Sequence, residues 1–140
     1  MMIAESKSCS GCHNRVLIAD DEREVCKFIR SCFFRELPDC WVDIAVSGEE
    51  VVSAFRETRS NAIVLDIFMP SMNGVEAFHK IMKICEEEGW EIPIFIFHSA
   101  FHLPKEIQEY VGKDPGHCCI LQKPVDIQVL IEEIKNRLAA

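Results

Sequence analysis

The stretch IVLDIFMPSMNGVEAF, residues 63–78, begins with strand-forming apolar residues and reaches an acid at Asp66. A loop that contains Pro70 and Gly74 follows, and apolar residues then return at helical spacing from Val75. A buried strand followed by an amphipathic helix is the repeating unit of a parallel sheet. The stretch therefore predicts a strand that carries a carboxylate to one edge of such a sheet.

The same unit of strand and helix recurs along the chain, five times in all. Each predicted strand is a short apolar run, and each predicted helix has apolar residues three and four positions apart. Such an alternation predicts an α/β fold with a doubly wound parallel sheet that is covered on both faces. The predicted strands are residues 15–20, 41–46, 62–66, 92–97 and 118–121.

The composition is that of one globular domain, because 140 residues with 49% hydrophobic and 27% charged residues are ordinary values. The net charge of -8 argues against nucleic acid or an anionic membrane as a direct partner, since both need clustered cations.

No apolar run approaches the ~20 residues of a membrane span. The N-terminus also lacks the apolar core of a signal peptide, so we expect a cytoplasmic protein. We expect most of the eight cysteines to be reduced core residues.

Polar residues stand at the ends of four predicted strands. The carboxyl ends of parallel strands meet at one edge of a sheet, and ligands bind there in folds of this class. We therefore expect three carboxylates, one hydroxyl and one ammonium group to converge at that edge. These groups belong to Asp20, Asp21, Asp66, Ser99 and Lys123.

Electrostatics restricts what such a cluster can do. Two like charges ~4 Å apart repel by about 4 kcal/mol at an effective dielectric constant near 20. Three carboxylates beside one Lys therefore require either a raised pKa or a bound divalent cation. Oxygen ligands favour a hard ion such as Mg²⁺. Mg²⁺ beside an Asp, a Lys and a hydroxyl is an arrangement suited to phosphoryl transfer, with the Asp as nucleophile.

The chain resembles a known family, the CheY-like receiver domains of two-component response regulators. The resemblance is carried by Asp20-Asp21, the run DIFMPSMNG from Asp66 to Gly74, Ser99-Ala100 and Lys123-Pro124. It implies a flavodoxin-like (βα)5 sheet with the strand order 2-1-3-4-5 in a receiver domain of residues 15–140. Residues 1–14 would then be a flexible leader.

The resemblance also implies a function. Asp66 would accept a phosphoryl group from a sensor histidine kinase or a phosphotransfer protein. Ser99 would be the switch hydroxyl, and Lys123 would pair with the phosphate and follow the family in having a cis bond to Pro124. Phosphorylation would alter the contact of the domain with an unknown downstream protein. The domain would therefore be a signalling phospho-acceptor and not an enzyme, although it would assist its own phosphorylation and dephosphorylation. The implied ligands of Mg²⁺ are the carboxylates of Asp20, Asp21 and Asp66 and the main-chain carbonyl of Phe68.

Two other functions share this fold. A Mg²⁺-dependent phosphohydrolase would also use an Asp nucleophile, but that chemistry often places a second acid two residues later, where this chain has Phe68. An interaction module that is independent of phosphorylation would need the fold but not the cluster of acids. The intact cluster therefore favours the phospho-acceptor.

The segment CSGCH, residues 9–13, suggests a third class of function, a redox or metal sensor. It has the C-x-x-C-H pattern of haem attachment, a chemistry that belongs to an extracytoplasmic compartment. Cys9, Cys12 and His13 would also make a partial zinc site without an identifiable fourth ligand. His117 and Cys118-Cys119 would supply one only if the leader folds back. The simpler interpretation is a leader whose cysteines are incidental.

Overall fold

The computed structural model describes residues 14–69, 71–100 and 103–139. Five parallel strands form one sheet in the order β2-β1-β3-β4-β5, which confirms the predicted fold class and strand order. The strands are β1 (Asn14–Ala19), β2 (Cys40–Ala45), β3 (Ala62–Asp66), β4 (Ile94–Ser99) and β5 (Cys119–Gln122).

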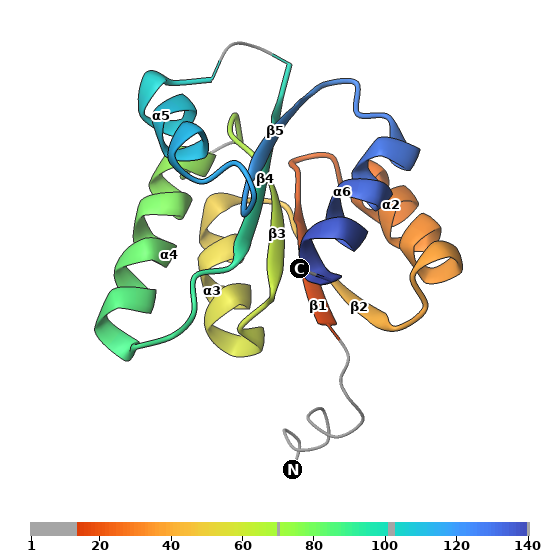
Figure 1. Ribbon diagram of the computed structural model, residues 1–140, viewed down its shortest axis with the longest axis horizontal. Coiled ribbons are helices and arrows are strands. Elements are labelled where there is room, and N and C mark those ends of the chain that lie inside the picture. The colour runs from red at the N-terminus through yellow and green to blue at the C-terminus, as the bar shows by residue number, and fades with distance from the viewer. Residues whose placement is uncertain (1–13, 70, 101–102, 140) are drawn as a thin grey trace.

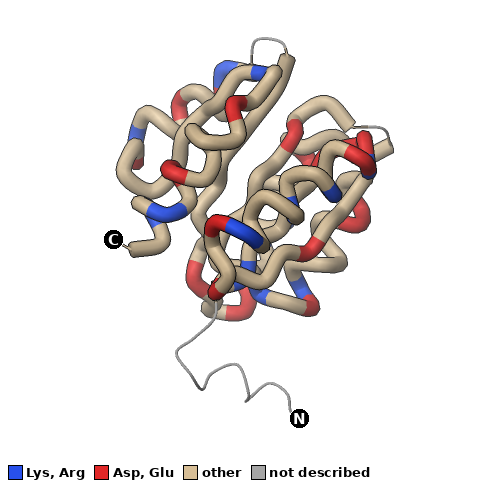
Figure 2. Tube along the Cα trace, turned by 90° about the vertical axis from the view of Figure 1, so that its right-hand side faces the viewer, with Lys and Arg blue, Asp and Glu red and all other residues tan. Residues whose placement is uncertain are grey.

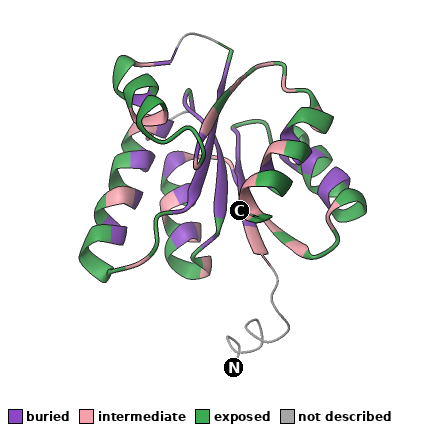
Figure 3. Ribbon diagram, in the orientation of Figure 1, coloured by how far each residue is buried: buried purple, intermediate pink, exposed green. Residues whose placement is uncertain are grey.

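Helices cover both faces of this sheet (Figure 1). One hydrophobic cluster, which includes Phe55 and Phe78, lies between the sheet and three helices, and a second, which includes Phe33 and Ile131, lies under the other two. Figure 3 shows buried central strands and helices whose outer faces are exposed. None of the described helices is long and apolar enough to cross a membrane. The first face carries α3 (Gly48–Thr58), α4 (Gly74–Glu88) and α5 (Lys105–Lys113), and the second carries α2 (Arg23–Glu36) and α6 (Ile127–Ala139).

Four of the five predicted strands are displaced along the chain, and β1 and β2 each begin one residue earlier than predicted. The prediction placed the fourth strand at residues 92–97, but β4 is Ile94–Ser99. Pro93 has no N–H group to pair with a neighbouring strand. Its carbonyl oxygen accepts a hydrogen bond from the side chain of His117. Because β4 is shifted toward the C-terminus by two residues, His98 lies within the strand. The fifth strand likewise begins one residue later than predicted, at Cys119.

Helix α4 begins and ends at residues that explain its bounds. Asn73 caps its first turn by accepting a hydrogen bond from the backbone of Glu76, whose side chain accepts one from the backbone of Asn73 in return. The helix ends at Gly89, which adopts the left-handed conformation and confirms the predicted stop. The cap fixes where the loop after β3 ends.

Gly74 brings that loop back against β3. Its backbone N–H donates a hydrogen bond of 2.7 Å to the carbonyl of Ile67. A Cβ atom at this position would lie 2.4 Å from the carbonyl oxygen of Asp66 and 2.7 Å from the Cα of Ile67. Only glycine therefore lets the start of α4 lie directly over the end of β3.

Gly74→Ala is expected to lower the free energy of unfolding by roughly 1–3 kcal/mol, because the added methyl group meets rigid backbone. Chemical denaturation measures this change. Gly112→Ala is the matched control, since a Cβ there meets nothing within 4 Å and alanine favours the helix by up to ~1 kcal/mol. Equal stability of the two variants would contradict the close approach at Gly74.

Candidate functional site

The carboxyl ends of the strands form the edge at the top of Figure 1, and the chain brings its polar strand-end residues to that edge. Asp20 follows β1, and its N–H donates to the carbonyl of Ala45, which continues the pairing with β2. Asp66 ends β3, and Ser99 ends β4 in a buried position. Lys123 follows β5, and its N–H donates to the carbonyl of Ser99 at 2.9 Å. The backbone of the sheet thus sets the positions of these residues.

Lys123 joins two buried carboxylates. Its Nζ lies 2.8 Å from Oδ2 of Asp20 and 3.0 Å from Oδ2 of Asp66. Both carboxylates are almost fully buried, whereas the Lys123 side chain is a quarter exposed. The peptide bond between Lys123 and Pro124 is cis, as the resemblance implied. One ammonium group therefore links the ends of three strands.

Asp21 adds a third carboxylate to this cluster, which confirms the predicted convergence of the acids. Asp20, Asp21 and Asp66 each offer an oxygen within 4.8 Å of the others, and Asp21 is the exposed member. Although Lys123 is close, Oδ2 of Asp20 receives no well-directed hydrogen bond from any described residue. Three convergent carboxylates, one of them fully buried, are a donor set that fits Mg²⁺.

The structure fixes the carboxylate of Asp66 from a second direction. The N–H of Phe68 donates to Oδ1 of Asp66 at 3.1 Å, while Oδ2 faces Lys123. Both oxygens are thus held, and the side chain has one defined orientation. The role of the Phe68 carbonyl as a metal ligand stays a prediction.

The pKa values of the three acids reflect their crowding. Burial raises the pKa of Asp66, and the hydrogen bond and charge of Lys123 offset this only in part. Burial also raises the pKa of Asp21, and the neighbouring Asp20 raises it further. Burial acts on Asp20 in the same direction, but its contacts with Lys123 and the backbone N–H of Glu22 prevail and lower its pKa. Because metal ligands must be ionised, any cation bound here is held more weakly in acid than at neutral pH.

His98 is a residue whose environment the sequence did not reveal; we expected it to pack near the site without chemistry. Its ring is buried, Nε2 lies 3.4 Å from the carbonyl oxygen of Ala19, and Nδ1 has no partner among the described residues. Burial, followed by the charge of Lys123, lowers the pKa of His98 to about 4. The signal in the sequence was its place in an otherwise apolar strand beside Ser99.

The cysteines divide into two groups. The leader pair Cys9 and Cys12, together with His13, lies outside the described residues. Six cysteines within the described ranges are free thiols, and most of these are buried, as predicted. The buried ones are Cys26, Cys32, Cys85 and Cys118.

Known proteins share this sequence pattern and fold. The model of the response regulator receiver domain family matches residues 16–135. Response regulator MprA of Mycolicibacterium vanbaalenii is 26% identical over 125 residues, which cover 89% of this chain and 50% of that protein. The chain thus spans about half the length of this curated relative.

Two solved structures show the same fold. A CheY-like response regulator receiver domain protein of Methanospirillum hungatei superposes with a TM-score of 0.74 at 22% identity, covering 91% of this chain and 94% of that one. The CheX–CheY–BeF3–Mg²⁺ complex of Borrelia burgdorferi gives a TM-score of 0.71 at 23% identity, covering 89% of each chain.

His98→Leu is expected to flatten the pH dependence of stability in the presence of a chelator. An unfolded His has a pKa near 6.5, so between pH 6.5 and 4 the unfolded chain binds more protons than the folded one. Stability is therefore complete above pH 6.5 and falls by up to roughly 3 kcal/mol as the pH drops to 4. Urea titrations across this range measure the slope, and identical slopes for the wild type and the variant would contradict a buried neutral His98.

Proposed function

The chain belongs to the response regulator receiver domain family, a signalling module of two-component systems, and on this premise we propose that it accepts a phosphoryl group on Asp66 from a phosphohistidine donor. The contact of Lys123 with both Asp20 and Asp66 is the observation that supports this proposal. It places a cation at the carboxylate that would carry the phosphoryl group. Such a relay operates in the cytoplasm.

In the proposed transfer, a carboxylate oxygen of Asp66 attacks the phosphorus atom of the donor. The new O–P bond forms as the P–N bond to the imidazole breaks, and the imidazole leaves and takes up a proton. The N–H of Phe68 holds the carboxylate in one orientation, which favours an in-line approach. Lys123 pairs with the phosphoryl oxygens as charge accumulates on them.

The metal that fits the acidic cluster is Mg²⁺. When bound, it supplies positive charge to the transferring phosphoryl oxygens. The protein's part is to hold three carboxylates close together in their ionised form, against the burial that opposes ionisation. The proposed ligands are Asp20, Asp21, Asp66 and the main-chain carbonyl of Phe68.

Phosphorylation would act through Ser99 and Lys123. Each new hydrogen bond to a charged group contributes ~1.5–3 kcal/mol, so these two side chains supply ~3–6 kcal/mol at most. Inverting a two-state population from 1:99 to 99:1 needs ~5.5 kcal/mol. Only the upper end of this range reaches that value, so the phosphoryl group would bias α5 and β5 toward a second arrangement and in this way change the binding of a downstream protein.

A groove of about 430 Å³ beside the acidic site is where the donor protein would bind. It lies between α2 and the start of α6, on the side of the molecule that faces the viewer in Figure 2. Its apolar wall includes Phe28, which is 58% exposed, and Ile127. Because Asp20 and Lys123 line the same groove, a protein with an apolar ridge bound there would present its phosphohistidine to Asp66.

The test of the phospho-acceptor is incubation with acetyl phosphate and Mg²⁺, followed by intact mass measurement. The wild type is expected to gain one phosphoryl group, and this gain is lost in Asp66→Ala and when a chelator removes the metal. Asp39→Ala, which changes an Asp outside the cluster, is expected to behave like the wild type. A phosphorylated Asp66→Ala protein would refute the assignment, and steady hydrolysis of a generic phosphate ester by the wild type would point to a phosphohydrolase instead.

Phe28→Ala is expected to slow transfer from a phosphorylated histidine kinase about tenfold or more, because burying an aromatic side chain contributes ~1.5–3 kcal/mol. The kinase is one first shown to phosphorylate the wild type. Transfer from acetyl phosphate should keep its wild-type rate, since the small donor makes no use of the groove. Phe34→Ala is the control, because Phe34 is 78% exposed on the same helix and does not line the groove. Equal slowing with both donors would argue against docking there.

A further inference from the structure

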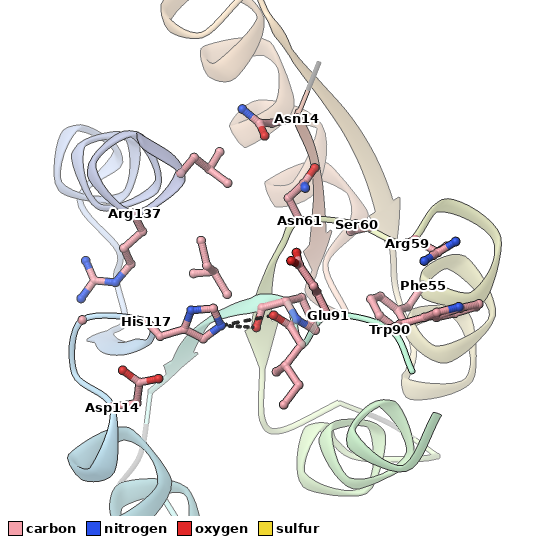
Figure 4. Close-up of a pocket in the computed structure, with 15 residues that line it drawn as sticks. Asn14, Phe55, Arg59, Ser60, Asn61, Trp90, Glu91, Asp114, His117 and Arg137 are labelled. Atoms are coloured by element: carbon pink, nitrogen blue, oxygen red, sulfur yellow. Dashed lines mark hydrogen bonds between the residues drawn. The ribbon is translucent and has the colours of Figure 1, made fainter. Parts of the chain in front are cut away.

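Two described residues other than glycine have a positive φ angle, and each is in contact with one end of α3. Arg59 has a φ of 50° and ends α3, where a left-handed residue is common. Its guanidinium group lies 4.4 Å from the centre of the Trp90 ring. Figure 4 shows these two side chains at one end of a pocket at the amino edge of the sheet. The conformation of Arg59 thus has a local explanation, whereas Ser71, with a φ of 70°, ends no helix.

Ser71 lies in the loop between Asp66 and α4, and it is bound to the start of α3. Its hydroxyl donates a hydrogen bond of 2.9 Å to a carboxylate oxygen of Glu49, in the first turn of that helix. The pKa of Glu49 lies below its ordinary value, because the carboxylate accepts hydrogen bonds from its own backbone N–H, from Ser71 and from the backbone N–H of Met72. One side chain of α3 therefore holds two consecutive residues of the loop.

Gly48 brings the backbone of α3 against the same part of the loop. A Cβ atom at Gly48 would lie 2.2 Å from the carbonyl oxygen of Met72 and 2.6 Å from its Cβ. The first turn of α3 is itself well fixed, because the side chain of Ser47 caps it and its inner face is buried. The start of α3 is therefore a firm support for the loop that follows Asp66.

The supported loop also carries Phe68, whose N–H holds the carboxylate of Asp66 and whose carbonyl is a proposed ligand of Mg²⁺. Ile67 and Met69 on either side are buried, which fixes the path of the chain. Burial of these side chains still leaves the peptide group after Phe68 able to rotate about its two soft dihedral angles. Contacts farther along the loop, at Ser71 and Met72, restrict that rotation. A strained residue such as Ser71 persists only where its surroundings hold it, and such residues gather at functional sites.

We propose that Glu49 is a positioning residue of the metal site, which holds the loop after Asp66 in its Mg²⁺-binding conformation through the hydrogen bond with Ser71. Glu49 is not part of the cluster of Asp20, Asp21 and Asp66, so it acts on the ion only through the loop. The inference rests on the proposed magnesium site. The strained φ angle of Ser71 lowers the stability of the loop and at the same time prepares it for the metal.

The experiment measures Mg²⁺ affinity of the full chain from the movement of its backbone amide signals in NMR spectra, and stability by urea denaturation with a chelator. Ser71→Gly removes the hydroxyl and the strain together, because glycine adopts a positive φ readily. This variant is expected to be as stable as the wild type or more so, since the relief of strain offsets the lost hydrogen bond. Its dissociation constant for Mg²⁺ is nevertheless expected to rise about threefold to tenfold, the range that one hydrogen bond contributes.

Two substitutions of Glu49 separate its hydrogen bond from its charge. Glu49→Ala is expected to weaken Mg²⁺ binding as much as Ser71→Gly does. Glu49→Gln keeps an acceptor oxygen for Ser71, so its affinity is expected to stay within about twofold of the wild type. Glu57→Ala, which removes an exposed acid from the same helix, is the matched control and is expected to bind Mg²⁺ like the wild type.

Each contrary result overturns the proposal in a different way. Wild-type affinity in Glu49→Ala and Ser71→Gly removes the positioning role, and equal weakening in Glu49→Gln and Glu49→Ala assigns the effect to charge. Weaker binding in Ser71→Gly together with an equal loss of stability assigns it to the folding of the loop. A wild type that binds no Mg²⁺ refutes the proposed magnesium site itself, and this role of Glu49 with it. Phosphorylation by acetyl phosphate, measured on the same proteins, shows separately whether Asp66 is the phospho-acceptor.

Discussion

The ion pairs of Lys123 with Asp20 and Asp66 are the constraint on which the rest of this structure depends. Asp20 is fully buried and Asp66 is 3% exposed, so each would be strongly destabilising as an unpaired charge. Lys123 lies within 3.0 Å of both, and its own pKa rises because the two carboxylates outweigh the effect of its burial. The sheet can therefore end β1 and β3 on acids only because β5 delivers a cation between them.

Lys123 neutralises only part of the negative charge of the three carboxylates, and the charge that is left explains the chemistry of the site. One ammonium group faces three carboxylates, and the pKa values of Asp21 and Asp66 remain raised. The folded protein thus holds negative charge that a cation at the same point would stabilise. The repulsion between these carboxylates lowers the stability of the folded protein and favours the binding of a cation. Perturbed pKa values are common at functional sites for this reason. Gly74 lets α4 begin directly against the backbone of Asp66 at the end of β3.

The sequence predicted much of the fold and most of the acidic site, for a definite reason. Parallel strands place their last residues at one edge, so Asp20, Asp66 and Lys123 could be brought together from local patterns alone. The surroundings of His98 could not be predicted, because its ring contacts the carbonyl of Ala19, which is 79 positions away in the chain. The predicted start of β4 was wrong for a local reason, because the apolar run was taken to begin at Ile92 although Pro93 lacks the N–H group that strand pairing uses. The spacing of apolar residues within a short segment predicts whether that segment is a strand or a helix. Contacts between segments that are far apart in the sequence decide which polar side chains are buried.

Strand β4 connects the two edges of the sheet. It begins just after Ile92 and Pro93, whose carbonyls orient His117, and it ends at Ser99 beside the acidic cluster. Its pairing with β3 and β5 extends to its last residues, so the strand cannot slide without breaking both ladders. The sheet therefore holds the end of β4 in one register beside the end of β3, which carries Asp66. The buried strands in this way give the loops at the carboxyl edge a rigid base, so that the positions of the acidic residues are set by the sheet.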